Sequence, residues 1–262
     1  DVLGYGVEYG DVKMLTFKNV TFQYPEDKEA MMKGLSFHVD KGEFVSLIGA
    51  SGCGKSTIFR LINRLLEPDQ GEIYVDGKEI HGIKSYAGYM PQKDLLFPWR
   101  TIEKNLCLPM EIQKKSKAEQ EKRVTEVLRE VGLEDYRNKY PKDLSGGMRQ
   151  RISFARTLLT DAELMLLDEP FSALDALTRM DMQEWLLRQW EHFHKTILFI
   201  THDVEEAVFL SKKIYIITET PITQIEIAEV PEAYPRNREF LRRPEIEALK
   251  SRLTMQLRKQ VM

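Results

Sequence analysis

The sequence predicts an α/β protein with a mostly parallel central sheet, an antiparallel β subdomain and an α-helical subdomain. The main observation is that strand patterns and helical patterns alternate in the second half of the chain, as in parallel sheets with crossover helices. A glycine-rich segment at residues 49–56 lies between a short apolar run and a helical pattern. A third observation is a stretch rich in Glu and Lys at about 94–143, which we interpret as the helical subdomain.

The segments nearest the N-terminus predict the antiparallel β subdomain. Residues 14–24 alternate between apolar and polar side chains and indicate a strand, with its antiparallel partner at 35–39. Residues 71–80 favour a hairpin, because Asp76 and Gly77 supply its turn.

Residues 49–56 read GASGCGKS and match the phosphate-binding loop G-x-x-x-x-G-K-[ST], the P-loop. A predicted strand at 43–48 precedes it, and helical spacing at 56–66 follows, which is the context that the motif requires. The glycines let the backbone fold around phosphates, Lys55 places its charge on the β and γ oxygens, and Ser56 offers a hydroxyl to Mg²⁺. Cys53 is interpreted as an ordinary loop residue without a redox role. The predicted nucleotide-binding residues of this segment are Gly49, Ser51, Gly52, Cys53, Gly54, Lys55, Ser56 and Thr57.

The second half of the chain predicts the parallel sheet and a tail. Prolines at 221, 231 and 235 mark a loop-rich segment, and a helix is expected from about Pro244 to Lys259. We therefore expect one domain at 13–218 and a C-terminal tail at 219–262 that packs on the core and ends in a helix. The alternating elements are helix 147–159, strand 164–168, helix 175–193, strand 196–201, helix 203–210 and strand 213–218.

Polar side chains follow three of the predicted strands. Asp168 ends the run LMLLD and can reach a Mg²⁺ shell, and Glu169 follows it as a candidate general base. Taken alone, the two acids would equally suit a strand cap, but the P-loop upstream favours catalysis. His202 follows another strand, at the sheet edge where α/β proteins bind ligands, and is a candidate γ-phosphate sensor. Gln92 follows a strand at 86–91, and its amide can ligate Mg²⁺ or water.

A second phosphate-binding element is predicted at residues 144–150, LSGGMRQ. Its Ser-Gly-Gly turn opens a helical pattern, so backbone N–H groups and a helix N-terminus can face a phosphate. A chain with two such elements can form composite sites with a second copy of itself. Tyr24, at the end of the first strand, can stack on a nucleobase. Asp175, in SALD, is expected to cap the next helix.

Composition excludes several other classes of protein. The 262 residues are 42% hydrophobic and 30% charged, as in ordinary globular proteins. The net charge of −3 provides no basic field for nucleic acid, and two cysteines are too few for a disulfide framework. That cysteine usage fits a reducing cytosol. No apolar run approaches the roughly 18 residues of a membrane span, no secretory signal opens the chain, and a start at Asp1 favours a trimmed N-terminus.

The ordered set of motifs over roughly 13–218 resembles the nucleotide-binding subunits of ATP-binding cassette (ABC) transporters. Other P-loop proteins, such as kinases and GTPases, lack the LSGGM turn. The resemblance implies that two subunits sandwich two ATP molecules with Mg²⁺. It places Ser145, Gly146 and Gly147 on the γ-phosphate of ATP held by the partner's Lys55, and Asp175 at the dimer seam.

Two segments indicate a subgroup within the ABC transporter family. Residues 95–106 and 201–218 are similar to ATPase subunits of nitrate/sulfonate/taurine/bicarbonate-type importers, a group that also holds thiamine-precursor and riboflavin importers. Met148 stands where the wider family usually has Gln, but this group often has Met. The resemblance implies an ATP-hydrolysing subunit that powers uptake of a small solute through separate membrane subunits. It also implies a peripheral place on the cytoplasmic face of a prokaryotic plasma membrane, with an extracytoplasmic substrate-binding protein as an indirect partner.

Two alternatives remain at this point. A soluble ABC ATPase of DNA repair or translation would carry a long coiled-coil insertion or a second cassette, and neither pattern is present. The ATPase of an exporter, or of a lipid or polar amino acid importer, is the other alternative.

The segment 93–101 contains five successive apolar residues, 95–99. We expect Leu95 and Leu96 to be core residues. Phe97 and Trp99 flank Pro98, which disfavours regular structure, and aromatic side chains on an irregular surface loop suit an interface. We therefore expect them to dock a helix of the membrane permease.

Overall fold

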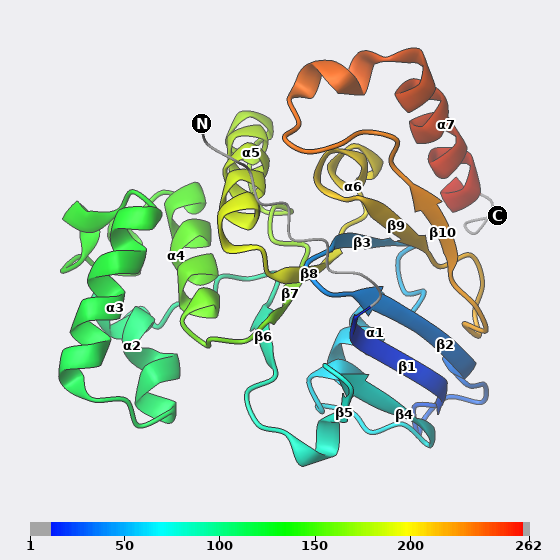
Figure 1. Ribbon diagram of the computed structural model, residues 1–262, viewed down its shortest axis with the longest axis horizontal. Coiled ribbons are helices and arrows are strands. Elements are labelled where there is room, and N and C mark those ends of the chain that lie inside the picture. Colours follow the sequence, from blue (N-terminus) through cyan, green and yellow to red (C-terminus); the bar gives the residue numbers. More distant parts are fainter. Residues whose placement is uncertain (1–11, 259–262) are drawn as a thin grey trace.

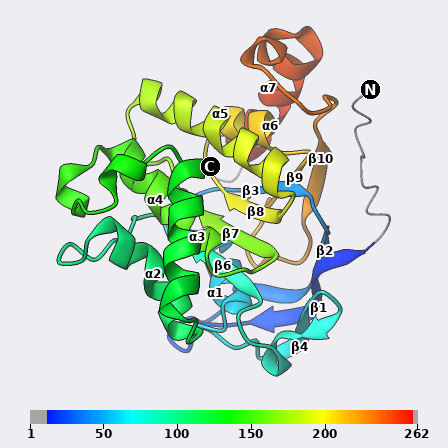
Figure 2. The ribbon, with the colours of Figure 1, turned by 60° about the vertical axis from the view of Figure 1, so that its left-hand side comes forward.

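A computed structural model describes residues 12–258 and contains two sheets (Figure 1). A six-stranded sheet has the order β10-β9-β3-β8-β7-β6, and a four-stranded sheet has the order β2-β1-β4-β5. Helices α2, α3 and α4 form a group beside β6, whereas α7 lies beside α6 near the opposite end of the larger sheet, by β9 and β10 (Figures 1 and 2).

The four-stranded sheet is antiparallel, as the sequence predicts. β1 pairs with β2 and with β4, and β4 pairs with β5. Asp76 and Gly77 form the predicted hairpin turn, both with positive φ (49° and 71°). The predicted end of the first strand was wrong, because pairing stops at Phe22 and Tyr24 lies in the following loop. The strands are β1 (Lys13–Phe22), β2 (Met32–Asp40), β4 (Gln70–Val75) and β5 (Lys78–Glu79).

The six-stranded sheet is mostly parallel, which confirms the predicted fold class. β3 pairs in parallel with β8 and β9, and β7 pairs in parallel with β6 and β8. β10 pairs antiparallel with β9 and was not predicted. The strands are β3 (Phe44–Ile48), β6 (Ala87–Met90), β7 (Leu164–Asp168), β8 (Thr196–Ile200), β9 (Lys213–Ile216) and β10 (Glu226–Glu229).

The helices fall where the sequence predicts them, with shifted ends. The helix expected at 56–66 ends at Ile62, because Arg64 adopts a left-handed φ of 54° two residues later. Hydroxyl or carboxylate side chains cap the N-termini of α2, α3, α4, α5 and α6. The helices are α1 (Lys55–Ile62), α2 (Ile102–Ile112), α3 (Lys117–Glu130), α4 (Gly146–Leu158), α5 (Ala176–Phe193), α6 (Val204–Leu210) and α7 (Pro244–Arg258), with short 3₁₀ turns η1 (Ile80–Gly82), η2 (Glu134–Tyr136), η3 (Pro141–Asp143) and η4 (Arg238–Arg242).

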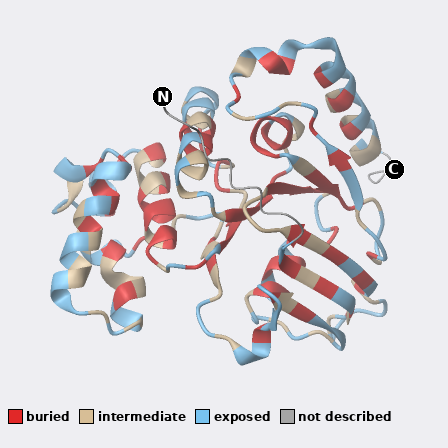
Figure 3. Ribbon diagram, viewed as in Figure 1, coloured by how far each residue is buried: buried red, intermediate tan, exposed pale blue. Residues whose placement is uncertain are grey.

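Strands β3, β7 and β8 in the middle of the larger sheet are buried along almost their whole length (Figure 3). Along β3, Phe44 and Ile48 join the core formed with α2 to α7, whereas Val45 and Leu47 join the core shared with α1 and the antiparallel sheet. This alternation follows from the period of two in a strand. β3 is therefore buried on both faces, which holds the loop after it in a fixed position.

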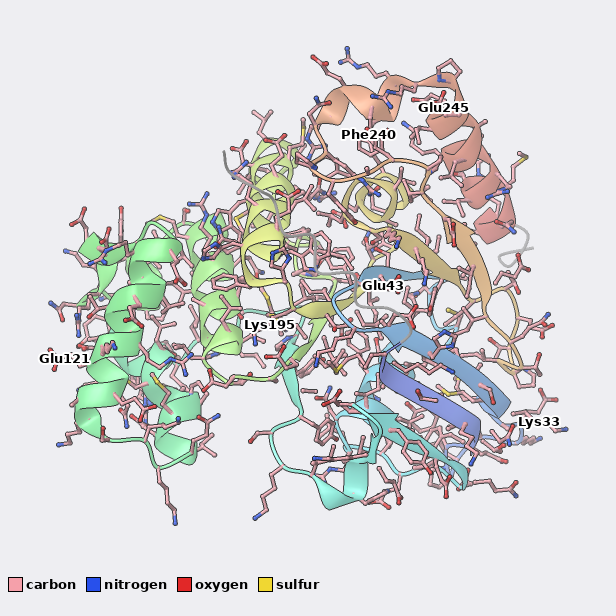
Figure 4. All side chains as sticks on the ribbon, viewed as in Figure 1. Lys33, Glu43, Glu121, Lys195, Phe240 and Glu245 are labelled. Carbon is pink, nitrogen blue, oxygen red and sulfur yellow. The ribbon has the colours of Figure 1, made fainter. Side chains whose placement is uncertain are left out.

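The tail returns to the core. Ile246, Leu249 and Leu253 of α7 are buried, and the ring of Phe240 (labelled in Figure 4) stacks on Phe209 of α6 with centroids 6.2 Å apart. The domain limits 13–218, about 94–143 and 219–262 remain predictions, and residues 259–262 lie outside the described part of the chain.

In the apolar segment at 95–99, the burial of the two leucines differs from the prediction. Leu96 is buried as predicted, but the prediction for Leu95 was wrong, since this residue is 58% exposed. Leu95 has a left-handed φ of 45°, and the N–H of Leu96 donates to Asp94 Oδ1 at 3.1 Å. This local turn sends the two neighbouring side chains in opposite directions.

Candidate nucleotide site

The P-loop joins β3 to α1, and Lys55 is the first residue of that helix. Gly54 has a φ of 102°, and a Cβ there would lie 2.9 Å from Met31 Sδ, so glycine suits both the backbone and the space. The buried Lys55 Nζ donates to the carbonyls of Gly49 and Ala50, both at 2.8 Å. The lysine charge therefore lies at the centre of the loop, where phosphate oxygens are expected.

The loop forms one side of a cavity of about 450 Å³. Its other side carries the side chains that follow β7 and β8. The structure thus brings Glu169 and His202 to the P-loop, as the shared edge of neighbouring parallel strands predicts. The lining residues are Tyr24, Met31, Ser51, Gly52, Gly54, Lys55, Ser56, Thr57, Glu169 and His202.

Two predicted P-loop residues are not lining residues of this cavity. Gly49 supplies a carbonyl to Lys55. Cys53 is buried with its Sγ 3.8 Å from Lys55 Nζ, and burial raises the pKa of the thiol. A raised pKa disfavours the reactive thiolate at neutral pH, in keeping with an ordinary loop residue.

Tyr24 closes another side of the cavity from the loop after β1. Its hydroxyl lies 3.0 Å from Thr57 Oγ1, and its ring meets that of Phe22 edge to face at 4.9 Å. These contacts hold the ring at the cavity wall, where one π-face of a nucleobase can stack.

Asp168 and Glu169 have different surroundings although they are adjacent. The hydroxyl of Tyr89 donates to Asp168 Oδ2 at 3.1 Å, and burial raises the pKa of Asp168. Burial and the nearby Asp168 carboxylate raise the pKa of Tyr89 to about 12, so this hydroxyl stays a donor. Asp168 is thus a half-buried carboxylate, and a nearby cation would favour its ionised form.

Glu169 lies at the centre of a polar group. It has a φ of 44°, and its N–H donates to Ile200 O at 3.0 Å. Its Oε2 lies 3.1 Å from His202 Nδ1 and 3.5 Å from Gln92 Nε2, which also donates to Ser172 Oγ at 3.1 Å. The three predicted side chains therefore converge, although the 3.5 Å contact is long for a hydrogen bond.

The second phosphate-binding element lies elsewhere. Ser145 caps α4 by accepting from the Met148 N–H at 3.3 Å. A Cβ on Gly147 would lie 2.9 Å from Thr178 Cγ2, so α4 and α5 pack closely there. Asp175 caps α5 through the Thr178 N–H at 3.1 Å. Hydrogen bonding to the side chain of Thr178, and then to its backbone, lowers the pKa of Asp175. Ser145, Gly146, Gly147 and Asp175 do not line the cavity with Lys55 in the described part of one chain.

Some residues of the site were not predicted. Met31 lines the cavity, Tyr89 holds Asp168, and Ser172 holds Gln92. The sequence did contain a signal for Tyr89, because this residue lies three positions before Gln92 on a strand that was expected to end at the same sheet edge. We find no sequence signal for Met31 or Ser172.

The fold and the site together define a P-loop nucleotide-binding protein of the cassette type. The family model described as "ABC transporter" matches residues 32–172. The chain belongs to the ABC transporter family. The resemblance in motif order is thereby confirmed, as are the fold class and the expectation of an ATP-hydrolysing transport subunit.

Curated relatives cover most of the chain. The formylaminopyrimidine import ATP-binding protein ThiZ of Halalkalibacterium halodurans is 45% identical over 221 residues, or 84% of this chain and 85% of the relative. The aliphatic sulfonates import ATP-binding protein SsuB of Bacillus thuringiensis subsp. konkukian is 40% identical over 208 residues, which cover 79% of this chain and 82% of the relative.

Solved structures agree with the fold. The dimeric ATP-binding cassette MJ0796, in a post-hydrolysis state bound to ADP and Pi, matches with a TM-score of 0.70 at 29% identity and covers 84% of this chain and all of its own. The structure of CbiO1 from Clostridium perfringens matches with a TM-score of 0.76 at 22% identity, covering 96% of this chain and all of that one, which supports the fold alone. Within residues 12–258, no helix has the length and apolar character needed to cross a bilayer.

Proposed function

We propose that this chain powers the import of a small solute by hydrolysing ATP while it is attached to separate membrane-spanning subunits. The observation that carries the proposal is that Glu169 and His202, 3.1 Å apart, line the same cavity as Lys55, with Gln92 next to Glu169. In this arrangement Lys55 binds the β and γ phosphates, and Glu169 takes a proton from the attacking water. His202, held 3.1 Å from Glu169, orients that carboxylate and senses the γ-phosphate.

Mg²⁺ fits the same site. The donor set of the Ser56 hydroxyl, the Asp168 carboxylate and the Gln92 amide consists of the hard oxygen ligands that Mg²⁺ prefers. The raised pKa of Asp168 supports this fit, since a half-buried carboxylate gains from a neighbouring cation. When bound with ATP, Mg²⁺ would neutralise charge on the phosphates.

The complete site requires a second copy of the chain. Ser145 and Asp175 are exposed helix caps that do not line the cavity with Lys55. A helix N-terminus that begins with Gly146 and Gly147 presents free N–H groups suited to a phosphate. The dimeric state of the cassette MJ0796 supports this assignment. The γ-phosphate would then lie between one chain's Lys55 and the partner's Ser145.

The loop at Phe97–Trp99 suits docking of a permease helix. Trp99 is 72% exposed, and its ring lies 5.2 Å from that of Phe97. Buried Asn105 fixes the loop backbone from below, because it accepts from the Phe97 N–H at 2.7 Å and donates to the carbonyls of Phe97, Arg100 and Thr101. The aromatic pair therefore sits on a rigid base, as an interface anchor requires.

The relatives indicate the class of cargo. ThiZ is named for import of formylaminopyrimidine and SsuB for import of aliphatic sulfonates. We infer a small polar organic or oxyanion solute, delivered by an extracytoplasmic substrate-binding protein that touches the permease and not this chain. The chain would lie on the cytoplasmic face of the plasma membrane.

Reconstitution tests this function. The chain is co-expressed with importer permease subunits from the same genome, and the complex is placed in vesicles with a substrate-binding protein. We expect ATP hydrolysis that rises with binding protein and solute, together with solute uptake. The proposal would be contradicted if the chain hydrolysed ATP but a pull-down from native membranes recovered no membrane-spanning partner with it.

A further inference from the structure

Behind His202 lies a buried polar network centred on Glu206 of α6, which is only 6% exposed. Glu206 Oε2 accepts from the Thr201 hydroxyl at 2.6 Å, and Oε1 accepts from Gln183 Nε2 at 2.9 Å. The Thr201 hydroxyl in turn accepts from the Asp203 N–H at 3.0 Å. The residues on both sides of His202 are therefore tied, through one hydroxyl, to a single carboxylate.

The network extends toward Asp175. Arg179 Nε lies 3.9 Å from Glu206 Oε1, and Arg179 Nη2 donates to the carbonyl of Leu174 at 3.0 Å. Among the described residues, Arg179 Nε has no hydrogen-bond partner in the structure. Arg179 thus connects the segment before Asp175 to the carboxylate that supports His202.

The tail reaches the same network through Gln183. Arg238 Nη2 donates to Gln183 Oε1 at 2.6 Å, and its Nε donates to Glu184 Oε1 at 2.9 Å. Its guanidinium also lies 4.7 Å from the ring centroid of Phe209 in α6. Because Arg238 can only donate, it fixes the Gln183 amide with the oxygen toward the tail and the nitrogen toward Glu206. Without Arg238, the amide loses this constraint.

Arg236 holds the other end of α6. Its Nη1 donates to the carbonyls of Val208, Phe209 and Ser211 at 3.1, 3.2 and 2.8 Å. Carbonyls at the end of a helix lack partners within the helix, so a buried cation satisfies them. The tail therefore contacts α6 at its last turn and, through Gln183, near its start.

We propose that Glu206 is a positioning residue, and that Arg238 of the tail and Arg179 beside the Asp175 turn act through it to hold His202 against Glu169. This inference rests on the proposed ATPase function. The His202 side chain is 63% exposed. Its position therefore depends on the backbone that Thr201 and Asp203 fix.

Arg238→Ala tests the proposal, with Arg243→Ala as a matched control. Arg243 forms its ion pair with Glu232, within the tail. We expect Arg238→Ala to lower kcat about tenfold, a size typical of residues that couple sites. ATP affinity should stay at the parental value, because no P-loop donor changes. Arg238→Lys should recover part of kcat, since an ammonium can still donate to Gln183. An equal loss in Arg243→Ala, or no loss in Arg238→Ala, would overturn the proposal.

A spectroscopic readout is independent of activity. The chain has five histidines, so the ring resonances of His202 can be assigned by comparison with His202→Ala. We expect Arg238→Ala and Glu206→Gln to shift the His202 resonances in nucleotide-free protein, and Arg243→Ala to leave them in place. Unchanged His202 resonances in both variants would refute the positioning role. If the parent chain failed to hydrolyse ATP, the proposed function would fail, while the resonances would still report on positioning.

Discussion

Glu169→Gln separates ATP binding from hydrolysis. The substitution keeps the side-chain shape, and the N–H bond to Ile200 at 3.0 Å involves only the backbone. An amide can still meet His202 Nδ1 and Gln92, but it cannot accept a proton from water. Loss of a general base costs about 10² to 10⁴ in rate, which corresponds to about 3 to 5 kcal/mol of barrier. We expect a fall in kcat within that range.

The assay combines three measurements on the same variant. Phosphate release gives kcat, a fluorescent ATP analogue gives affinity, and size exclusion with ATP detects a trapped dimer. Affinity should remain at the parental value, because Lys55 and the P-loop are unchanged. Glu219→Gln is a suitable control, because Glu219 is not one of the residues that line the cavity with Lys55. Parental kcat in Glu169→Gln would refute the assignment of Glu169 as the base.

Three further predictions concern the P-loop, the aromatic pair and the tail. Lys55→Ala should weaken ATP binding and lower hydrolysis by about a hundredfold or more, and near-normal turnover would exclude the P-loop role. Phe97→Ala combined with Trp99→Ala should leave the ATPase of the isolated chain intact but reduce complex assembly and uptake in vesicles; unchanged uptake at equal subunit abundance would argue against docking. Arg236→Ala should lower the free energy of unfolding by about 2 to 3 kcal/mol, because buried carbonyls of α6 lose a charged donor. Urea unfolding would measure that change, and a loss below about 0.5 kcal/mol, the size of an ordinary surface substitution, would contradict it.

The central elements could be predicted because their signals are local. The P-loop pattern indicates a strand, a turn and a helix, and the short apolar run LMLLD favours a buried strand before its acids. β10 was missed because its four residues begin and end with Glu, which masks any apolar pattern. The end of α1 was also missed, since the left-handed φ of Arg64 has no clear signal in the sequence.

The site was predictable where the chemistry needs one residue type, as with Lys55 and Glu169. It was less predictable where packing decides. Leu95 and Leu96 look identical in the sequence, yet a single turn exposes one and buries the other. The network behind His202 was not predicted, because Gln183 and Arg238 meet across 55 residues of chain.

The central claim is that each hydrolytic site is shared between two copies of the chain, and hydrolysis by Ser145→Arg tests it most directly. Ser145 is an exposed helix cap that does not line the cavity with Lys55 in its own chain. The account predicts that the variant binds ATP with parental affinity but hydrolyses it at the background rate, since arginine would block the partner's γ-phosphate. Parental hydrolysis by the Ser145→Arg homodimer at saturating ATP would contradict the shared site.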